Sequence, residues 1–165
     1  MATGSEAVVT GGALNRAIDA FASVSGGKCN VAGHDDVGRL CDLYPLGSFA
    51  SVSGGLLNTA AGMLSTVGGG EQNVSAGAMA SVSGGHGNAA TGPHAAVAGG
   101  TDNVASGDGS TVSGGDTNSA AGGNASVSGG TEGMADGAGA SVSGGSGRFA
   151  HGPNDWAAGS LLEDF

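Results

Sequence analysis

The sequence has few of the residues from which protein interiors are usually built. Aromatic residues make up 4% of the 165-residue chain, and it contains only 3 prolines. A conventional globular core of large side chains cannot be built from this composition. The 37 glycines follow no Gly-X-Y period, which excludes collagen. The chain is therefore either disordered or built from a regular repeat of small residues.

Basic residues are also scarce. Four Lys and Arg stand against 14 Asp and Glu, a net charge of -10, which repels phosphate backbones and anionic membrane surfaces. The sequence has no apolar run of 18 residues, and its first residues lack the basic and apolar regions of a secretory signal. We therefore expect no nucleic-acid partner and no membrane span in this chain.

A short repeat fills most of the chain. Its valines recur every 15 residues, apart from one step of 28 between the second and third: Val9, Val24, Val52, Val67, Val82, Val97, Val112, Val127 and Val142. A fixed short period with glycines at constant offsets predicts the stacked coils of a solenoid. Fifteen residues are too few for a helical hairpin, so we expect two short strands and two turns in each coil.

The alternation of side chains along a strand predicts what each coil buries. Numbering each coil from its valine as position 1, Ala or Ser at position 14 points inward with the valine, and the serines at positions 15 and 2 point outward. Gly-Gly at positions 3 and 4 forms a turn. Position 7 is an asparagine, expected to tolerate left-handed backbone and to form a ladder along the axis: Asn15, Asn30, Asn58, Asn73, Asn88, Asn103 and Asn118.

The repeat phrase A-S-V-S-G-G-x-x-N-x-A-x-G resembles the head repeat of YadA-like trimeric autotransporter adhesins, in which S-V-A-I-G is followed by A-x-G. The resemblance runs from Val9 to about Gly159. It implies a left-handed parallel β-roll, three chains around a threefold axis, and an adhesive function. The period is one residue longer than is usual in that family, and Gly-Gly replaces an apolar-Gly pair. No stalk heptads or anchor strands follow the repeats in this sequence, so we expect either a head excised from a longer adhesin or a related roll in a phage tail fibre or secreted particle.

We expect one solenoid domain over residues 1–165, with an N-terminal coil or cap at 1–21, repeats at 22–152 and a C-terminal cap at 153–165. The 28-residue step contains an insertion at 34–46, the least regular part of the sequence. Loops on a rigid scaffold commonly carry binding specificity. The predicted binding residues are in this insertion: His34, Asp35, Asp36, Arg39, Asp42 and Tyr44.

The two cysteines and the acidic residues have several interpretations. Cys29 and Cys41 predict a disulfide in an oxidising compartment, with two free thiols as the alternative. A metal site with His34 and its neighbours lacks any known ligand spacing, so no metal is predicted. Acidic residues recur after Gly-Gly and indicate a solvated edge, with Ca²⁺ as the alternative cofactor: Glu71, Asp102, Asp116 and Glu132.

Function is expected to be structural and adhesive. The four histidines fall in different columns and no nucleophile elbow surrounds a serine, so no enzyme activity is predicted. A partly apolar stripe at position 8 favours a homotrimer: Val31, Val74, Val104, Met134 and Phe149. We expect an extracellular head or fibre segment, on a cell or virion surface, whose loop contacts a host protein or glycan.

Two alternatives remain. One is a purely structural solenoid that forms a phage fibre or extracellular filament. The other is an ice-binding solenoid, because the outward serines form hydroxyl pairs, interrupted at Gly68 and at Ala96 and Ala98: Ser23/Ser25, Ser51/Ser53, Ser81/Ser83, Ser126/Ser128 and Ser141/Ser143.

Overall fold

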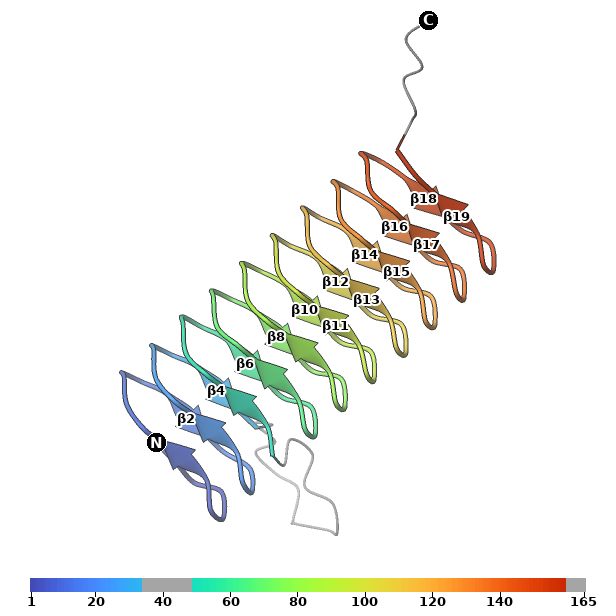
Figure 1. The fold of residues 1–165 in the computed structure, drawn as a ribbon. Helices are drawn as coiled ribbons and strands as arrows, with labels where there is room; N and C mark the ends of the chain where they lie inside the picture. The colour runs from blue at the N-terminus through green and yellow to red at the C-terminus, as the bar shows by residue number, and fades with distance from the viewer. Residues whose placement is uncertain (34–48, 160–165) are drawn as a thin grey trace, which may run out of the picture.

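The chain folds into a straight stack of parallel coils, as the computed structural model shows (Figure 1). The structure describes residues 1–33 and 49–159. Each coil contributes one two-residue strand to each of two sheets. The ten-stranded sheet contains β1 (Val8–Val9), β3 (Ser23–Val24), β5 (Ser51–Val52), β7 (Thr66–Val67), β9 (Ser81–Val82), β11 (Ala96–Val97), β13 (Thr111–Val112), β15 (Ser126–Val127), β17 (Ser141–Val142) and β19 (Trp156–Ala157).

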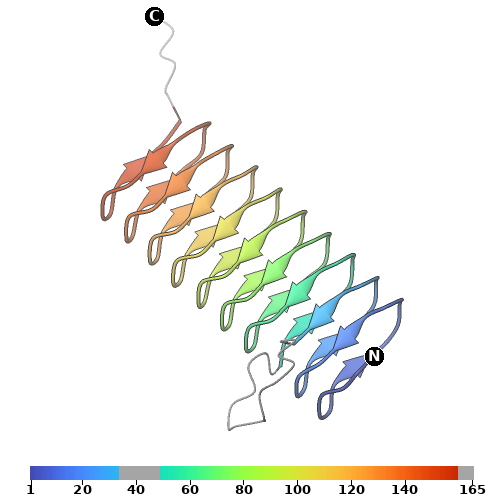
Figure 2. The ribbon, with the colours of Figure 1, turned by 180° about the vertical axis from the view of Figure 1, so that it is seen from behind.

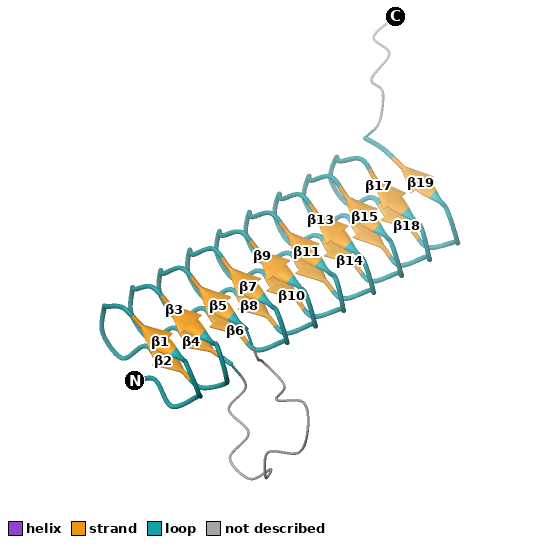
Figure 3. Cartoon of the chain, turned by 60° about the horizontal axis from the view of Figure 1, so that its bottom comes forward, coloured by secondary structure: helices purple, strands orange, loops and turns teal. Residues whose placement is uncertain are grey.

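The second sheet faces the first and takes the alternate strands. Its nine members are β2 (Arg16–Ala17), β4 (Val31–Ala32), β6 (Thr59–Ala60), β8 (Val74–Ser75), β10 (Ala89–Ala90), β12 (Val104–Ala105), β14 (Ser119–Ala120), β16 (Met134–Ala135) and β18 (Phe149–Ala150). Figures 2 and 3 show both sheets running the length of the stack. In the described part of the chain no helix is long and apolar enough to cross a membrane.

Every strand pairs in parallel with the equivalent strand of the next coil. Val82 lies opposite Val97, one 15-residue period away. Across the insertion the partners are Val24 and Val52, so the stack continues in register. The predicted parallel β-solenoid with 15-residue coils is confirmed.

The interior is a thin layer of valine and alanine. The valines of the ten-stranded sheet from Val24 to Val142 are at most 1% exposed, and they face the alanines of the second sheet, such as Ala60 and Ala90. Because successive strand residues point to opposite sides, the residue before each valine is left on the outer surface. The small residues at positions 9 and 14 follow from this arrangement, since the two sheets enclose only one valine per coil.

The buried asparagines join one coil to the next. Asn58 donates from Nδ2 to the carbonyl oxygens of Gly54 and Gly70, at 2.9 Å each, and its Oδ1 accepts from the backbone N–H of Asn73 at 3.0 Å. Asn73, Asn88 and Asn103 repeat this arrangement. Each side chain therefore has its donor and acceptor groups satisfied inside the protein, as buried amides require.

The asparagines of the ladder do not themselves adopt left-handed backbone. The positive φ falls on the preceding residue, for example 58° at Leu57 and 57° at Gln72. A second corner has the same conformation at position 13, as at Leu64 with φ 59°. The asparagine side chain is held inside by main-chain carbonyls, so the bend is made by the outward residue before it.

At one turn, close packing against the next coil also requires glycine. Gly70 has φ 84°, and a Cβ atom there would lie 2.2 Å from the carbonyl oxygen of Gly85. Only glycine combines this conformation with so close an approach of the next coil.

Candidate functional surfaces

The predicted binding loop lies outside the described residues. This applies to His34, Asp35, Asp36, Arg39 and Asp42, and equally to Tyr44 and Cys41. Cys29 is half-buried at a corner of the second coil, and no residue that the structure describes forms a disulfide with it. The loop contacts and the Cys29–Cys41 disulfide therefore stay predictions.

The outer surface of the ten-stranded sheet, here called the hydroxyl face, consists of two rows of short side chains. Position 15 supplies Val8, Ser23, Ser51, Thr66, Ser81, Ala96, Thr111, Ser126, Ser141 and Trp156, and position 2 supplies Thr10, Ser25, Ser53, Gly68, Ser83, Ala98, Ser113, Ser128, Ser143 and Ala158. None of these residues is charged, although the chain carries a net charge of -10.

Most hydroxyl groups on this face are free. In the described chain only two hydrogen bonds join side chains of the face: Ser126 Oγ donates to Ser141 Oγ at 3.2 Å, and Trp156 Nε1 donates to Ser143 Oγ at 2.7 Å. Where Gly68 lacks a side chain, a shallow hollow opens among Ser51, Ser53, Thr66, Ser81 and Ser83, with Val67 and Val82 below them. The remaining hydroxyls are available to a ligand or to water.

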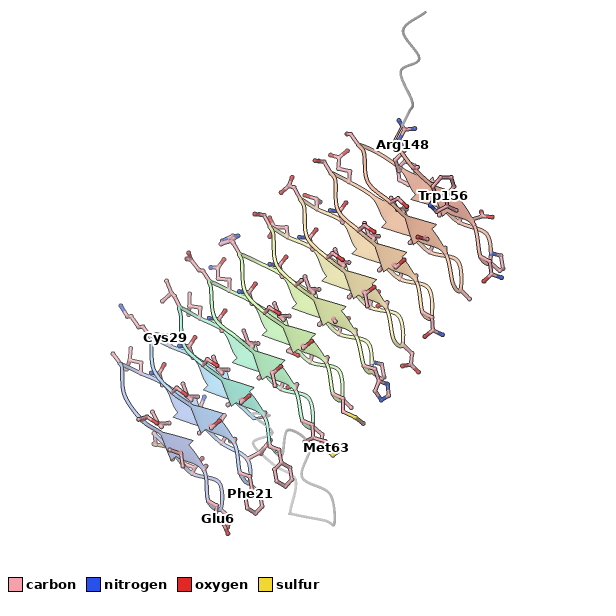
Figure 4. The ribbon with its side chains drawn as sticks, viewed as in Figure 1. Glu6, Phe21, Cys29, Met63, Arg148 and Trp156 are labelled. Carbon is pink, nitrogen blue, oxygen red and sulfur yellow. The ribbon has the colours of Figure 1, made fainter. Side chains whose placement is uncertain are left out.

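The corner at position 13 carries large apolar side chains on four successive coils, here called the apolar corner row. Phe21 is 45% exposed, Phe49 52%, Leu64 46% and Met79 48%. The rings of Phe21 and Phe49 are stacked, with centroids 4.7 Å apart. Figure 4 labels Phe21 at this corner of the stack.

The column continues in later coils with polar or very small residues. His94, Gly109, Asn124, Gly139 and Asn154 occupy the same corner. The 15-residue register of the sequence contains this row, but its members differ from coil to coil, unlike the repeated valine, glycine, asparagine and alanine columns. Phe49 directly follows residues 34–48, which include the expected binding loop, in the sequence.

The predicted position 8 stripe lies on the outer surface of the nine-stranded sheet. Val31 and Val74 are half-buried, whereas Val104 and Phe149 are exposed, the latter at 54%. Met134 is half-buried in the same row. These apolar side chains project from the opposite side of the solenoid to the hydroxyl face.

Histidine and aspartate pair between adjacent coils in the later part of the stack. Nδ1 of His94 lies 3.1 Å from Asp108, and Nδ1 of His151 lies 2.9 Å from Asp136. His86 is 4.0 Å from Asp102. All three pairs are exposed to solvent, so their contribution to stability is small.

Neither a metal centre nor a calcium site can be assembled from the residues that the structure describes. No group of three or more His, Cys, Asp or Glu side chains lies close enough together to hold an ion among them. The acidic residues that recur after Gly-Gly are spread along one edge: Glu71, Asp102, Asp116 and Glu132 are all exposed.

Comparison with known proteins gives no assignment. No family model matches this chain, and no curated protein matches it either. The likeness to trimeric autotransporter heads therefore rests on the repeat phrase alone.

Proposed function

We propose that this chain is a rigid structural and adhesive module, a head or fibre segment at an extracellular cell or virion surface. In this proposal the coils are left-handed, as in the adhesin heads that the repeat resembles, and three chains associate as a homotrimer. The observation that carries the adhesive function is the apolar corner row, because four successive coils expose large apolar side chains to water. A host protein or glycan would contact this row together with the adjacent loop.

Stability of the coil does not account for the row. Phe21, Phe49, Leu64 and Met79 all have φ between 58° and 61°. This left-handed conformation costs a residue with a Cβ about 1–2 kcal/mol, and glycine avoids the cost. Later coils use glycine, asparagine or histidine at the same corner, so apolar residues are not required to make the turn. Contiguous exposed apolar groups commonly mark a contact surface.

The nine-stranded sheet supports the trimer. Its outer surface carries Val31, Val74, Val104, Met134 and Phe149 in one row, parallel to the axis. Packing this row against two other chains would remove apolar area from water, at about 25 cal/mol per Å². The same assembly would leave the hydroxyl face, on the opposite side of each chain, exposed.

Adhesion is tested by replacing part of the apolar corner row. We expect Leu64→Asn with Met79→Asn to reduce adsorption of the protein to a methyl-terminated monolayer, measured with a quartz-crystal microbalance. Asparagine already occupies this corner at Asn124 and Asn154, so the fold is expected to survive. Light scattering on the same samples should give three times the 15.2 kDa chain mass.

The matched control places asparagine at the other corner. Gln72→Asn with Thr117→Asn changes two exposed neutral residues whose φ values are 57° and 56°, and adsorption should stay unchanged. Equal adsorption of both double variants and the parent would contradict the role of the row. A monomeric mass would exclude the trimer, and a trimer without adsorption would favour the purely structural alternative.

A further inference from the structure

We infer that the hydroxyl face binds the surface of ice. This inference is independent of the adhesive proposal, because it uses neither the apolar corner row nor the loop. It also uses the sheet opposite to the one assigned to the trimer. Its basis is a flat, uncharged, two-dimensional array of free hydroxyl groups on a scaffold that is already ordered.

The backbone fixes the spacing of the array. Neighbouring strands of a sheet lie about 4.8 Å apart, and the two outward residues of each coil, two positions apart on one strand, are separated by about 6.6 Å. All ten strands are paired in parallel and in register, from Val8 to Trp156. A regular array of hydroxyl groups at these two spacings can hold water molecules in a two-dimensional lattice, which is the kind of surface that an ice crystal presents.

The chemistry of the face favours ordered water over charged ligands. Charged side chains are absent from its twenty described positions, whereas the opposite sheet carries Arg16, Asp136 and His151. Hydroxyl groups donate and accept hydrogen bonds, as water does. Because only Ser126, Ser141 and Ser143 use a hydroxyl within the face, the other serines and threonines are free to bind surface water.

The interruptions do not obstruct the array. Ala96 and Ala98 replace hydroxyl groups by methyl hydrogens at the same height, and Gly68 leaves a hollow rather than a projection. The first bulky side chain is Trp156, at the C-terminal end. A flat crystal surface could therefore contact the rows from the second coil to Ser143.

The rigid frame lowers the cost of binding. The asparagine ladder and the parallel strand pairing hold neighbouring coils together before any ligand binds. Short Ser, Thr and Ala side chains lose little rotamer entropy on contact. A preorganised surface keeps more of its interaction energy as affinity.

Inhibition of ice recrystallisation by the full chain tests the inference. The parent protein is expected to inhibit crystal growth, and Ser81→Lys with Ser83→Lys should abolish the inhibition by placing two long charged side chains in the middle of the array. The matched control, Thr101→Lys with Thr131→Lys, adds the same charge at an exposed corner and should keep full activity. Circular dichroism establishes that both variants retain the fold.

A gain-of-function variant makes the test independent of damage to the fold. Ala96→Thr with Ala98→Thr fills the longest gap in the hydroxyl rows and is expected to increase the inhibition. The inference is overturned if the parent protein has no effect on ice, if Ser81→Lys with Ser83→Lys retains activity, or if the corner control loses it. Binding of the parent to insoluble cellulose without any effect on ice would also overturn it and would assign the face to a neutral polysaccharide.

Discussion

The early coils (residues 9–33 and 49–81) can be compared with the late coils (residues 82–159). Both have the same frame, meaning the buried valines and the hydrogen-bonded asparagines, but they differ in the residues at the position 13 corner. Val52 and Val112 are each 1% exposed, and the side-chain amides of Asn58 and Asn103 donate to equivalent pairs of turn carbonyls, each in its own coil and the next. At position 13, by contrast, the early coils expose phenylalanine, leucine and methionine, and the late coils expose histidine, glycine and asparagine. The comparison shows that columns outside the hydrogen-bonded frame vary without changing the fold, so binding properties are best sought there.

The largest expected effect comes from breaking the shared frame. Asn58→Ala and Asn103→Ala should each lower the free energy of unfolding by several kcal/mol, because a buried group left without its partner costs about 1–3 kcal/mol. Each change removes the amide donor to two glycine carbonyls and the acceptor of the next asparagine N–H.

Urea denaturation of the two variants measures this effect. The losses should be similar, since both asparagines are fully buried and make equivalent bonds. A large loss in one half of the stack and a negligible loss in the other would show that the frame is not equivalent along the axis.

A smaller effect is expected where the ladder ends. Gly133 stands at position 7, where it donates its N–H to Asn118 Oδ1 at 2.8 Å but has no side chain to continue the ladder. Gly133→Asn should raise the free energy of unfolding by about 1 kcal/mol, a typical net value for added hydrogen bonds. A Cβ there would lie 2.9 Å from Asn118 Oδ1 and 3.3 Å from Val142 Cγ1, so these side chains must shift by a small amount.

Thermal melting of Gly133→Asn tests this prediction, with Gly139→Asn as the control. Gly139 is an exposed corner glycine with φ 68°, outside the ladder. If both variants raise the melting temperature equally, the gain comes from replacing a flexible residue and not from the ladder.

The smallest effect is expected from exchanging the position 13 residues of the early and late coils. Leu64→Asn should raise the free energy of unfolding by up to about 1 kcal/mol, and Asn124→Leu should lower it by a similar amount, because leucine tolerates the left-handed conformation less well. Their φ values are 59° and 56°. Chemical denaturation of the two single variants and of the double variant gives both values, and a loss of stability in Leu64→Asn would show that row contacts stabilise the coil.

The sequence predicts the buried valines and asparagines well because they recur at a fixed 15-residue period. Every coil repeats the valine and asparagine of its neighbours, so alternation along a strand is enough to identify the interior. The direction of the bend was harder to predict, because it depends on which residue next to the asparagine takes the positive φ. That choice follows from carbonyl positions in the adjacent coil, which no single repeat contains.

The candidate surfaces were predicted less completely. The paired serines of the hydroxyl face follow directly from alternation. The apolar corner row was missed because Phe21 and Phe49 are separated by the 28-residue step, and neither resembles the residues found at that corner later in the chain. The position 8 stripe was identified from its apolar residues, and its packing in a homotrimer stays a prediction.

Because the strand register is unbroken on either side of residues 34–48, the sequence between them can change without changing the stack. Val24 pairs with Val52 and Ala32 with Ala60 as if the two coils were contiguous in sequence. Such a corner is a tolerant attachment point, where segments of different length and composition could be exchanged while the stack above and below stays the same. In a solenoid of this kind, the sequence of the stacked coils can stay the same while the sequence inserted at one corner changes.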